Sequence, residues 1–293
     1  MNALGTEQVN ANTMDIDRLN ALEIARKINA EDKTVAVVVE VALPRIAQAA
    51  EMYAATIRQG HRVLYIGAGT SGRLGVLDAA ECPPTFGTDP SQIIGVISGG
   101  YDSLVLSQEG VEDREDEARK DLQWKNLAAG DFVIGIAASR RTPYTLSGLS
   151  YAQSLGCRTA FIICNHSGNL EFKPDVLIEL PVGPEVITGS TRMKSGTAQK
   201  MTLNIISTTA MVLLGKTYGN LMVDLQARSE KLAARSRKIL MDLFTMPLDH
   251  ANLLLERAGG SVKVAIVMQK FSCDRADAEA RLTAAGGYIS RIR

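Results

Sequence analysis

The sequence predicts an α/β protein of three layers, with helices on both faces of a five-stranded parallel sheet. Five short apolar runs have the length of strands, and the stretches between them are long enough to hold helices. The runs are continuously hydrophobic rather than alternating, as in strands buried on both faces. These observations indicate an α/β/α arrangement with right-handed crossovers. The runs are residues 62–66, 93–97, 132–136, 159–164 and 176–180.

Residues 15–59, which precede the first strand, are predicted to be helical. Apolar side chains from Leu19 to Ile28 recur at helical spacing, and Pro44 is expected to break or kink the helix. The β-branched run 34–39 is compatible with a strand, but its alanine-rich continuation favours a helix.

After the fifth strand we expect a loop over residues 181–190 and a long helix over 192–214. Beyond residue 220 the chain is richer in charge, and paired glycines at 259–260 and 286–287 separate several short helices. We therefore expect three parts. They are an N-terminal helical segment (1–52), a sheet domain (53–218) and a small C-terminal helical module (219–293).

Composition excludes several classes of partner. The 293 residues include 32 Lys and Arg and 32 Asp and Glu, so the formal net charge is zero. That balance, with only 5% aromatic residues, argues against binding to nucleic acid or to an anionic membrane surface. No apolar run reaches the ~18 residues of a membrane helix. The first 17 residues lack the apolar core of a signal peptide, so we expect a cytoplasmic protein.

The four cysteines show no metal-binding pattern. They form no C-x-x-C pair and have no histidines nearby at zinc-ligand spacing. We expect reduced thiols and no metal site. The cysteines are Cys82, Cys157, Cys164 and Cys273.

The first strand leads into the glycine-rich segment 67–75, which contains G-x-G-x-x-G. A dinucleotide site would also need an acidic residue at the end of the second strand, but residues 96–100 are Val-Ile-Ser-Gly-Gly. Hydroxyls at a helix N-terminus suit a phosphate monoester instead. A tight turn with a helix cap would explain only one glycine and one hydroxyl. We predict a phosphate cradle made of Gly69, Thr70, Ser71 and Gly72.

Two further hydroxyl-rich loops follow later strands. Ser139 and Thr142 come after the third strand, and Ser190 and Thr191 precede the helix after the fifth. Each loop alone could be a helix cap, and Lys194 could pair with phosphate or simply lie at a helix start. Because the carboxyl ends of parallel strands share one sheet edge, the three loops together predict a single phosphorylated ligand.

The segments 67–87 and 183–200, with matches at 12–15 and 220–224, resemble the N-acetylmuramic acid 6-phosphate etherases of the SIS (sugar isomerase) domain superfamily. The resemblance implies an SIS-type fold with a UBA-like C-terminal module. It implies cleavage of the D-lactyl ether of the sugar phosphate to N-acetylglucosamine 6-phosphate and D-lactate, in cell-wall sugar recycling. It also implies a homodimer with the site near the subunit interface, and no metal or other cofactor.

Ether cleavage needs an acid and a base. In the open-chain sugar the carbon-1 aldehyde acidifies the carbon-2 proton, so elimination of the lactyl group and addition of water become feasible. By the resemblance the two catalytic carboxylates are Glu81, as acid, and Glu112, as base, and either could also activate water. Glu81 is expected to end its helix, just before Pro83 and Pro84 break it. Composition alone places Glu112 on a charged, solvated helix face, and Glu185 is either a third site carboxylate or a loop acceptor.

The sequence departs from the family pattern at two places. Arg140 replaces a glycine in the loop after the third strand, where it would crowd the site or add a cation. Val9-Asn10 replaces an Arg-Asn pair, which puts the polar contact of the N-terminal segment in question.

Other functions remain open on the residues alone. An SIS protein that senses sugar phosphates without turnover would carry the same phosphate cradle. An aldose–ketose sugar-phosphate isomerase is a second alternative. A dinucleotide oxidoreductase ranks last, because the ribose-binding carboxylate is missing.

Overall fold

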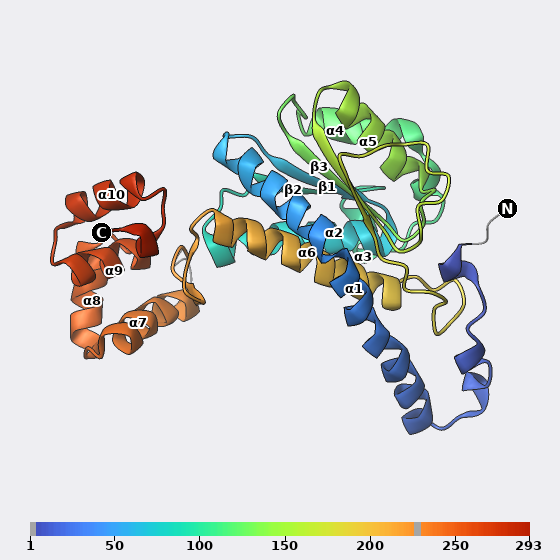
Figure 1. Cartoon of the computed structure of the whole chain (residues 1–293), viewed down its shortest axis with the longest axis horizontal. Helices are drawn as coiled ribbons and strands as arrows, with labels where there is room; N and C mark the ends of the chain where they lie inside the picture. The colour runs from blue at the N-terminus through green and yellow to red at the C-terminus, as the bar shows by residue number, and fades with distance from the viewer. Residues whose placement is uncertain (1–3, 226–229) are drawn as a thin grey trace. The chain divides into compact units, whose positions relative to one another are not determined.

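The computed structural model of the chain describes residues 4–225 and 230–293. The chain forms two compact units, each continuous in space but not in sequence (Figure 1). The first consists of Met1–Ala80 and Ser91–Ser207, and the second of Glu81–Pro90 and Thr208–Arg293. The three-part division at residues 52 and 218 stays a prediction. No helix among the described residues is long and apolar enough to cross a membrane.

The first unit contains a parallel five-stranded sheet in the order β2-β1-β3-β4-β5, which confirms the predicted fold class. β1 and β3 are buried along their whole length, as their continuous hydrophobicity requires. Because β1 pairs with both β2 and β3, the chain changes its direction of winding between β1 and β3. Ligands of open α/β sheets bind at such a point. The strands are β1 (Val63–Gly67), β2 (Ile93–Ile97), β3 (Phe132–Ala137), β4 (Arg158–Ile163) and β5 (Val176–Glu179).

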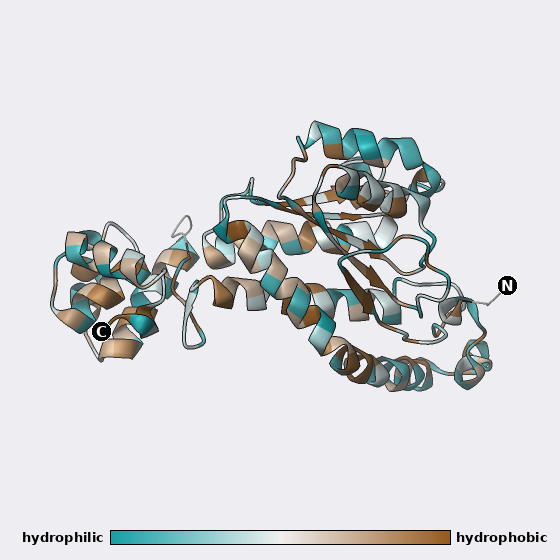
Figure 2. Cartoon of the chain, turned by 45° about the horizontal axis from the view of Figure 1, so that its top comes forward, coloured by the Kyte–Doolittle hydropathy of each residue, from teal (hydrophilic) through white to brown (hydrophobic). Residues whose placement is uncertain are grey.

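Helices cover both faces of this sheet (Figure 1). On one face α4 (Glu115–Trp124) and α5 (Pro143–Ser154) pack on the strands. Their core includes Leu122 and Leu149, which contact a cluster that contains Leu64 and Val133 of the sheet. The strands appear as the hydrophobic interior in Figure 2.

The other face of the sheet carries α1 (Ala21–Arg58), α2 (Gly69–Phe86) and α6 (Lys194–Leu213). α1 begins with a capping box between Asn20 and Glu23, so the residues from 15 to 20 form turns rather than helix. Of the two effects predicted at Pro44, a break or a kink, the break is wrong, because α1 runs through Pro44 without interruption. Glu40, whose carbonyl loses its partner at this proline, is exposed to water.

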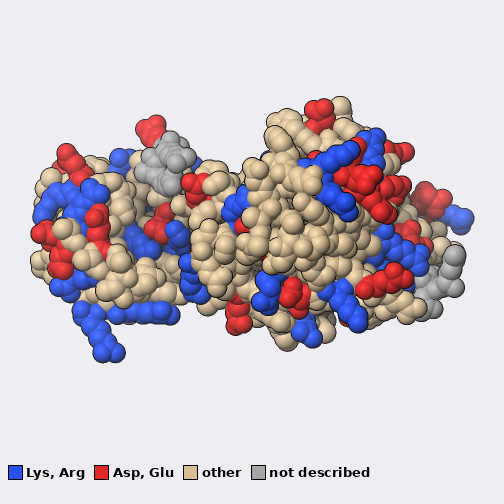
Figure 3. Space-filling view, turned by 90° about the horizontal axis from the view of Figure 1, so that it is seen from above, with Lys and Arg blue, Asp and Glu red and all other residues tan. Residues whose placement is uncertain are grey.

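Short segments connect these elements within the first unit. Three 3₁₀ turns precede α1, a short helix follows β2, and a 3₁₀ turn leads into α4. Figure 3 shows basic and acidic side chains interspersed on the viewed face, in keeping with the zero net charge. The connecting elements are η1 (Gly5–Glu7), η2 (Ala11–Thr13), η3 (Ile16–Arg18), α3 (Asp102–Val105) and η4 (Val111–Asp113).

The second unit is helical and small, as predicted. Its core is built on α9, of which Val262 to Met268 are all buried. Lys263 is a buried cation of this unit: it donates to the Gly215 carbonyl (2.8 Å) and pairs with Asp224 (3.3 Å). Burial lowers the pKa of this ammonium group, and the carboxylate opposes that shift. The elements are a β6 (Thr217–Tyr218) and β7 (Leu221–Met222) hairpin, α7 (Glu230–Phe244), α8 (Leu248–Arg257), α9 (Val262–Phe271), α10 (Arg275–Ala284) and η5 (Ile289–Arg291).

Candidate functional site

A cavity of about 340 Å³ lies at the carboxyl ends of β1 and β3, where the winding direction changes. Its lining gathers all three hydroxyl-rich loops predicted from the sequence, together with the turn that follows β2. The lining residues are Glu7, Ala68, Gly69, Thr70, Ser71, Ser107, Gln108, Glu109, Glu112, Ile136, Ala137, Ala138, Ser139, Thr142 and Thr191.

The glycines of the β1–α2 turn have two separate functions. A Cβ atom on Gly72 would lie 2.6 Å from the Gly67 carbonyl oxygen and 2.7 Å from Ile97, so these glycines allow strand and helix to pack closely. Gly69 has φ +54°, and a Cβ there would meet no atom within 4 Å. Gly69 therefore leaves backbone open toward the cavity, at the positive end of α2.

Ser71 is held in place at the start of α2. Its side chain is buried, and its Oγ donates to Gln199 Oε1 of α6 at 3.0 Å. Thr70 lies against Gly196, where an added Cβ would be 3.4 Å from Thr70 Cγ2. The N-terminal ends of α2 and α6 are thus close together at this edge of the sheet.

The loop after β3 presents Ser139 and Thr142 side by side, with their hydroxyl oxygens 3.4 Å apart. The Arg141 backbone N–H donates to Ser139 Oγ at 3.2 Å, which fixes this side chain. Thr142 precedes α5, whose first residue is Pro143. A second helix N-terminus therefore adds hydroxyls and a positive dipole end to the cavity.

The loop before α6 contributes Thr191 to the cavity, but Ser190 and Lys194 do not line it. Lys194 is 3% exposed, and its Nζ lies 2.7 Å from Glu31 Oε2 on α1. The charge of Lys194 is therefore paired with Glu31 inside the protein and does not face the cavity.

Glu185 is a helix cap. It is fully buried, and its carboxylate accepts the Lys194 N–H at 2.8 Å and both the N–H and the hydroxyl of Ser195, at 2.9 and 2.8 Å. Of the two interpretations of Glu185, the structure fits the loop acceptor, because these bonds satisfy the first N–H groups of α6.

Glu112 lines the cavity and lies in the 3₁₀ turn η4, before α4, rather than on the charged helix face that composition indicates. Ser98, at the end of β2, donates to the Val111 carbonyl at 2.5 Å. Gly110 adopts φ +78°, which turns the chain toward the sheet edge. Glu112 is half-buried, so a carboxylate is placed at the cavity by a defined turn.

Glu81 does not line the cavity within one chain. Its side chain is exposed, and it is ten residues after Ser71 on α2, or about 15 Å of helix rise. The predicted helix end before Pro83 is wrong, since α2 continues through both prolines to Phe86. Proline keeps a helical φ, and near a helix end it removes few backbone hydrogen bonds.

Sequence reasoning missed four polar lining residues. Ser107, Gln108 and Glu109 lie beside Glu112, and Glu7 comes from the N-terminal segment. No local pattern could indicate Glu7, because its contact with the cavity depends on distant parts of the chain. Among the described residues that line the cavity none is Lys or Arg, so the helix N-termini and hydroxyls are its donors for an anion.

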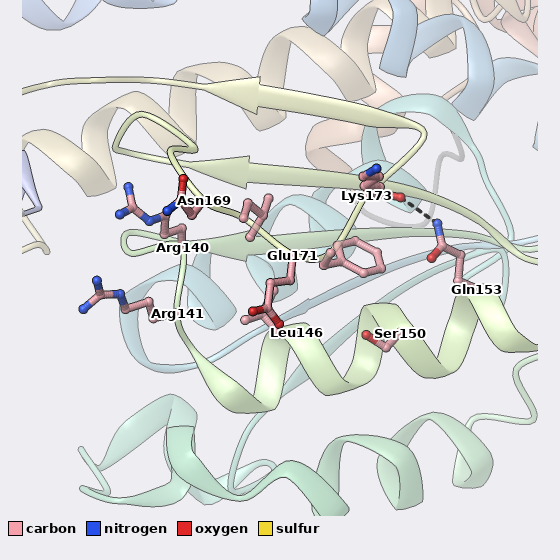
Figure 4. Close-up of a pocket in the computed structure, with 10 residues that line it drawn as sticks. Arg140, Arg141, Leu146, Ser150, Gln153, Asn169, Glu171 and Lys173 are labelled. Carbon is pink, nitrogen blue, oxygen red and sulfur yellow. Dashed lines mark hydrogen bonds between the residues drawn. The ribbon is translucent and has the colours of Figure 1, made fainter. Parts of the chain in front are cut away.

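Arg140 points away from this cavity. Its Nη1 donates to the His166 carbonyl at 2.8 Å, and its guanidinium covers Gly168. It lines a separate, larger cavity of about 1060 Å³ between α5 and the loop after β4 (Figure 4). Arg140 therefore neither crowds the 340 Å³ cavity nor adds a cation to it, but ties two neighbouring loops together.

The N-terminal segment is fastened to the same sheet edge. Thr6 N–H donates to Asn165 Oδ1 at 3.3 Å, and Asn165 Nδ2 donates back to Thr6 Oγ1 at 3.0 Å. Asn10 Nδ2 donates to the Pro184 carbonyl at 3.3 Å, whereas Val9 is exposed. Although the sequence lacks an arginine here, the segment keeps polar contacts with the loops after β4 and β5.

Fold and cavity together define an SIS-domain protein, with hydroxyls and helix N-termini at the switch point of a five-stranded parallel sheet. Residues 45–153 match the glucokinase regulatory protein N-terminal SIS domain family. The chain belongs to the N-acetylmuramic acid 6-phosphate etherase family. It is 47% identical over 288 residues to the etherase of Geobacillus sp. (strain WCH70), covering 98% of each chain. It is 48% identical to that of Erwinia tasmaniensis, covering 99% of this chain and 94% of the relative.

A solved structure gives the same fold at lower similarity. A Bacteroides fragilis protein involved in capsule formation aligns with a TM-score of 0.50 and 18% identity, over 66% of this chain and 91% of that one. At this identity the likeness concerns the fold alone. Within residues 4–225 and 230–293, no group of His, Cys, Asp and Glu side chains has the arrangement of a metal site.

Proposed function

We propose that this protein cleaves the lactyl ether of N-acetylmuramic acid 6-phosphate. The observation that carries the proposal is the identity of 46–50% over nearly the full length to relatives named as etherases of this substrate. The cavity supports it, because helix N-termini and hydroxyls suit a phosphate monoester and the carboxylate of Glu112 lines the same cavity.

The phosphate is assigned to the side of the cavity formed by Gly69, Thr70, Ser71 and the Ser139–Thr142 loop. Gly72 supports the turn and is not assigned to the phosphate, because its Cα packs against Gly67. With the phosphate held there, the rest of an open-chain sugar extends toward the turn that carries Glu112. Ser190 and Lys194 belong to the supporting structure of this site in the proposal, not to its ligand contacts.

The reaction proceeds by elimination and then addition of water. Glu112 removes the carbon-2 proton, which the carbon-1 aldehyde acidifies, and the bond from carbon 3 to the lactyl oxygen breaks. The acid Glu81 supplies a proton to that oxygen, giving D-lactate, and water then adds at carbon 3 to give N-acetylglucosamine 6-phosphate. The enzyme is in this proposal a carbon–oxygen lyase of cytoplasmic cell-wall sugar recycling, without a cofactor.

Because Glu81 does not line the cavity of its own chain, we assign it to the cavity of a second copy, in a homodimer. Exposed apolar side chains on α1 support self-association. Val37 is 60% exposed and Val41 80%, although both lie in the middle of a long helix. Light scattering on the purified protein tests the dimer, and Val37→Glu with Val41→Glu should give monomers.

The test is an incubation with N-acetylmuramic acid 6-phosphate in H₂¹⁸O, followed by measurement of D-lactate. The proposal expects D-lactate without label, and the label in the sugar phosphate. Label in lactate would contradict elimination. A raised melting temperature with no lactate would favour the sensor, and a ketose phosphate product would favour the isomerase.

A further inference from the structure

Glu109 and Glu112, which line the cavity, belong to the segment after β2, whereas the lining residue Glu7 comes from the N-terminal segment. It is on η1, and its Oε2 lies 3.7 Å from the position that a Cβ on Gly189 would occupy. The neighbouring Thr6 is fully buried and exchanges two hydrogen bonds with Asn165. The buried and hydrogen-bonded Thr6 thus fixes the chain just before Glu7, whose accessible carboxylate lines the cavity.

Glu7 and Glu112 reach the cavity from opposite sides. Asn165, which holds the neighbouring Thr6, follows β4, whereas Glu112 follows β2. In the sheet order β2-β1-β3-β4, these two strands flank β1 and β3, whose ends form the floor of the cavity. A ligand that fills the cavity therefore lies between the two carboxylates.

An ionised carboxylate accepts hydrogen bonds and repels anions. Glu7 is therefore repelled by the phosphate and by the lactyl carboxylate, and it needs a hydrogen-bond donor of the sugar. The amide N–H at carbon 2 belongs to the end of the sugar that Glu112 acts on in the proposed reaction, which leaves the hydroxyls for Glu7 on the opposite side. In the open-chain substrate carbon 1 is an aldehyde, carbon 2 carries the amide, carbon 3 the ether and carbon 6 the phosphate. The free hydroxyls are those at carbons 4 and 5, between the phosphate and the reacting atoms.

We propose that Glu7 is a substrate-binding residue whose carboxylate accepts a hydrogen bond from the carbon-4 or carbon-5 hydroxyl of the sugar. This inference rests on the proposed function. The N-terminal segment then completes the site from the same chain. Glu7 orients the sugar so that carbon 2 faces Glu112, and takes no part in the proton transfers.

The experiment compares KM and kcat of the wild type, Glu7→Ala and Glu7→Gln, with Gln8→Ala as the matched control. Gln8 is exposed beside Glu7 and does not line the cavity. Loss of a hydrogen bond to a charged group should raise KM about 10- to 100-fold in Glu7→Ala. Glu7→Gln, which keeps an acceptor oxygen, should lie between, and Gln8→Ala should match the wild type.

Substrates that lack the hydroxyl at carbon 4 or at carbon 5 separate binding from a structural effect. The wild type should discriminate against one of them by about the factor that Glu7→Ala loses, and Glu7→Ala should discriminate little. Equal discrimination by both enzymes for both analogues, or an unchanged KM in Glu7→Ala, would overturn the inference.

If the wild type releases no lactate, the proposed function fails by itself. The inference about Glu7 is then measured by calorimetry with N-acetylglucosamine 6-phosphate as the probe. Binding weakened about 10- to 100-fold in Glu7→Ala, but not in Gln8→Ala, supports the role of Glu7, and equal binding in all three proteins rejects it.

Discussion

Lys194 and Glu31, 163 residues apart in sequence, form an ion pair with Nζ and Oε2 2.7 Å apart. The pair ties the N-terminal third of α1 to the start of α6, next to the loop that carries Thr191 into the cavity. A buried ammonium group needs such a partner, because an unpaired charge in the interior is strongly unfavourable. Lys194, in the segment 188–197, therefore stabilises the structure around the site and does not line the cavity.

Removing one partner of this pair should destabilise the protein. We expect Lys194→Met to lower the free energy of unfolding by about 3 kcal/mol, because Glu31 is left without its cation. The double variant Glu31→Leu with Lys194→Met should recover a large part of that loss. Urea denaturation of the two single variants and the double variant measures the coupling, and additive losses would show that the pair contributes little.

The same pair predicts a dependence of stability on pH. Burial raises the pKa of Glu31, but hydrogen bonds from Lys194, Asn12 and Asn10 outweigh it, so the pKa lies below its usual 4.5. The carboxylate thus contributes stability above its unfolded pKa, and this contribution falls as the pH drops toward the lowered folded value. The stability difference between wild type and Glu31→Gln should be full at pH 7 and smaller at pH 3.5. An equal difference at both pH values would contradict the assignment.

The two proposed catalytic glutamates allow a complementation test. Glu112→Gln and Glu81→Gln should each fold normally and release lactate at least about 100-fold more slowly than the wild type. If each site combines Glu112 of one subunit with Glu81 of the other, mixing the unfolded variants and refolding them should restore about a quarter of the activity. No recovery from mixed dimers would place both groups in one chain.

Two glycines of the β1–α2 turn should respond differently to alanine. Gly72→Ala places a Cβ 2.6 Å from the Gly67 carbonyl oxygen, so overpacking should cost about 1–3 kcal/mol of stability. Gly69→Ala meets open space, but at φ +54° it should cost about 1–2 kcal/mol of backbone strain. Because Gly69 lines the cavity, its variant should also raise KM. Chemical denaturation and kinetics on the two variants check both statements, and an unchanged KM in Gly69→Ala would argue against ligand contact there.

The cysteines should differ in reactivity. Burial raises the pKa of Cys164 to about 12 and that of Cys157 to about 11. At pH 8 roughly one in ten thousand and one in a thousand of these groups would be thiolate, so both should resist iodoacetamide in the folded protein. Cys273 is partly exposed and should react first. Mass spectrometry of timed samples measures the order, with urea-unfolded protein as the control, and early labelling of Cys164 would contradict its burial.

The strands could be predicted from the sequence because their signal is local. A strand buried on both faces is apolar along its length, so runs such as Val63–Gly67 and Phe132–Ala137 are visible without their neighbours. The parallel sheet then brings the loops with Ser71 and Ser139 to one edge, which the order of elements implies. Helix boundaries were less predictable, since Pro44 and Pro83 lie inside helices. A proline leaves one backbone carbonyl of the preceding turn without its hydrogen bond, and the free-energy cost depends on whether water or another group can satisfy that carbonyl.

The amino-acid sequence by itself therefore determined the layers of the fold, the sheet edge that holds the cavity and the hydroxyls that face it. Tertiary structure decided which charged groups reach that cavity. Glu7 enters it through the contact between Thr6 and Asn165, Lys194 is drawn away by Glu31, and Arg140 turns to His166. The physical reason is that a long charged side chain takes the direction of its nearest counter-charge or acceptor, and that partner can lie anywhere in the chain.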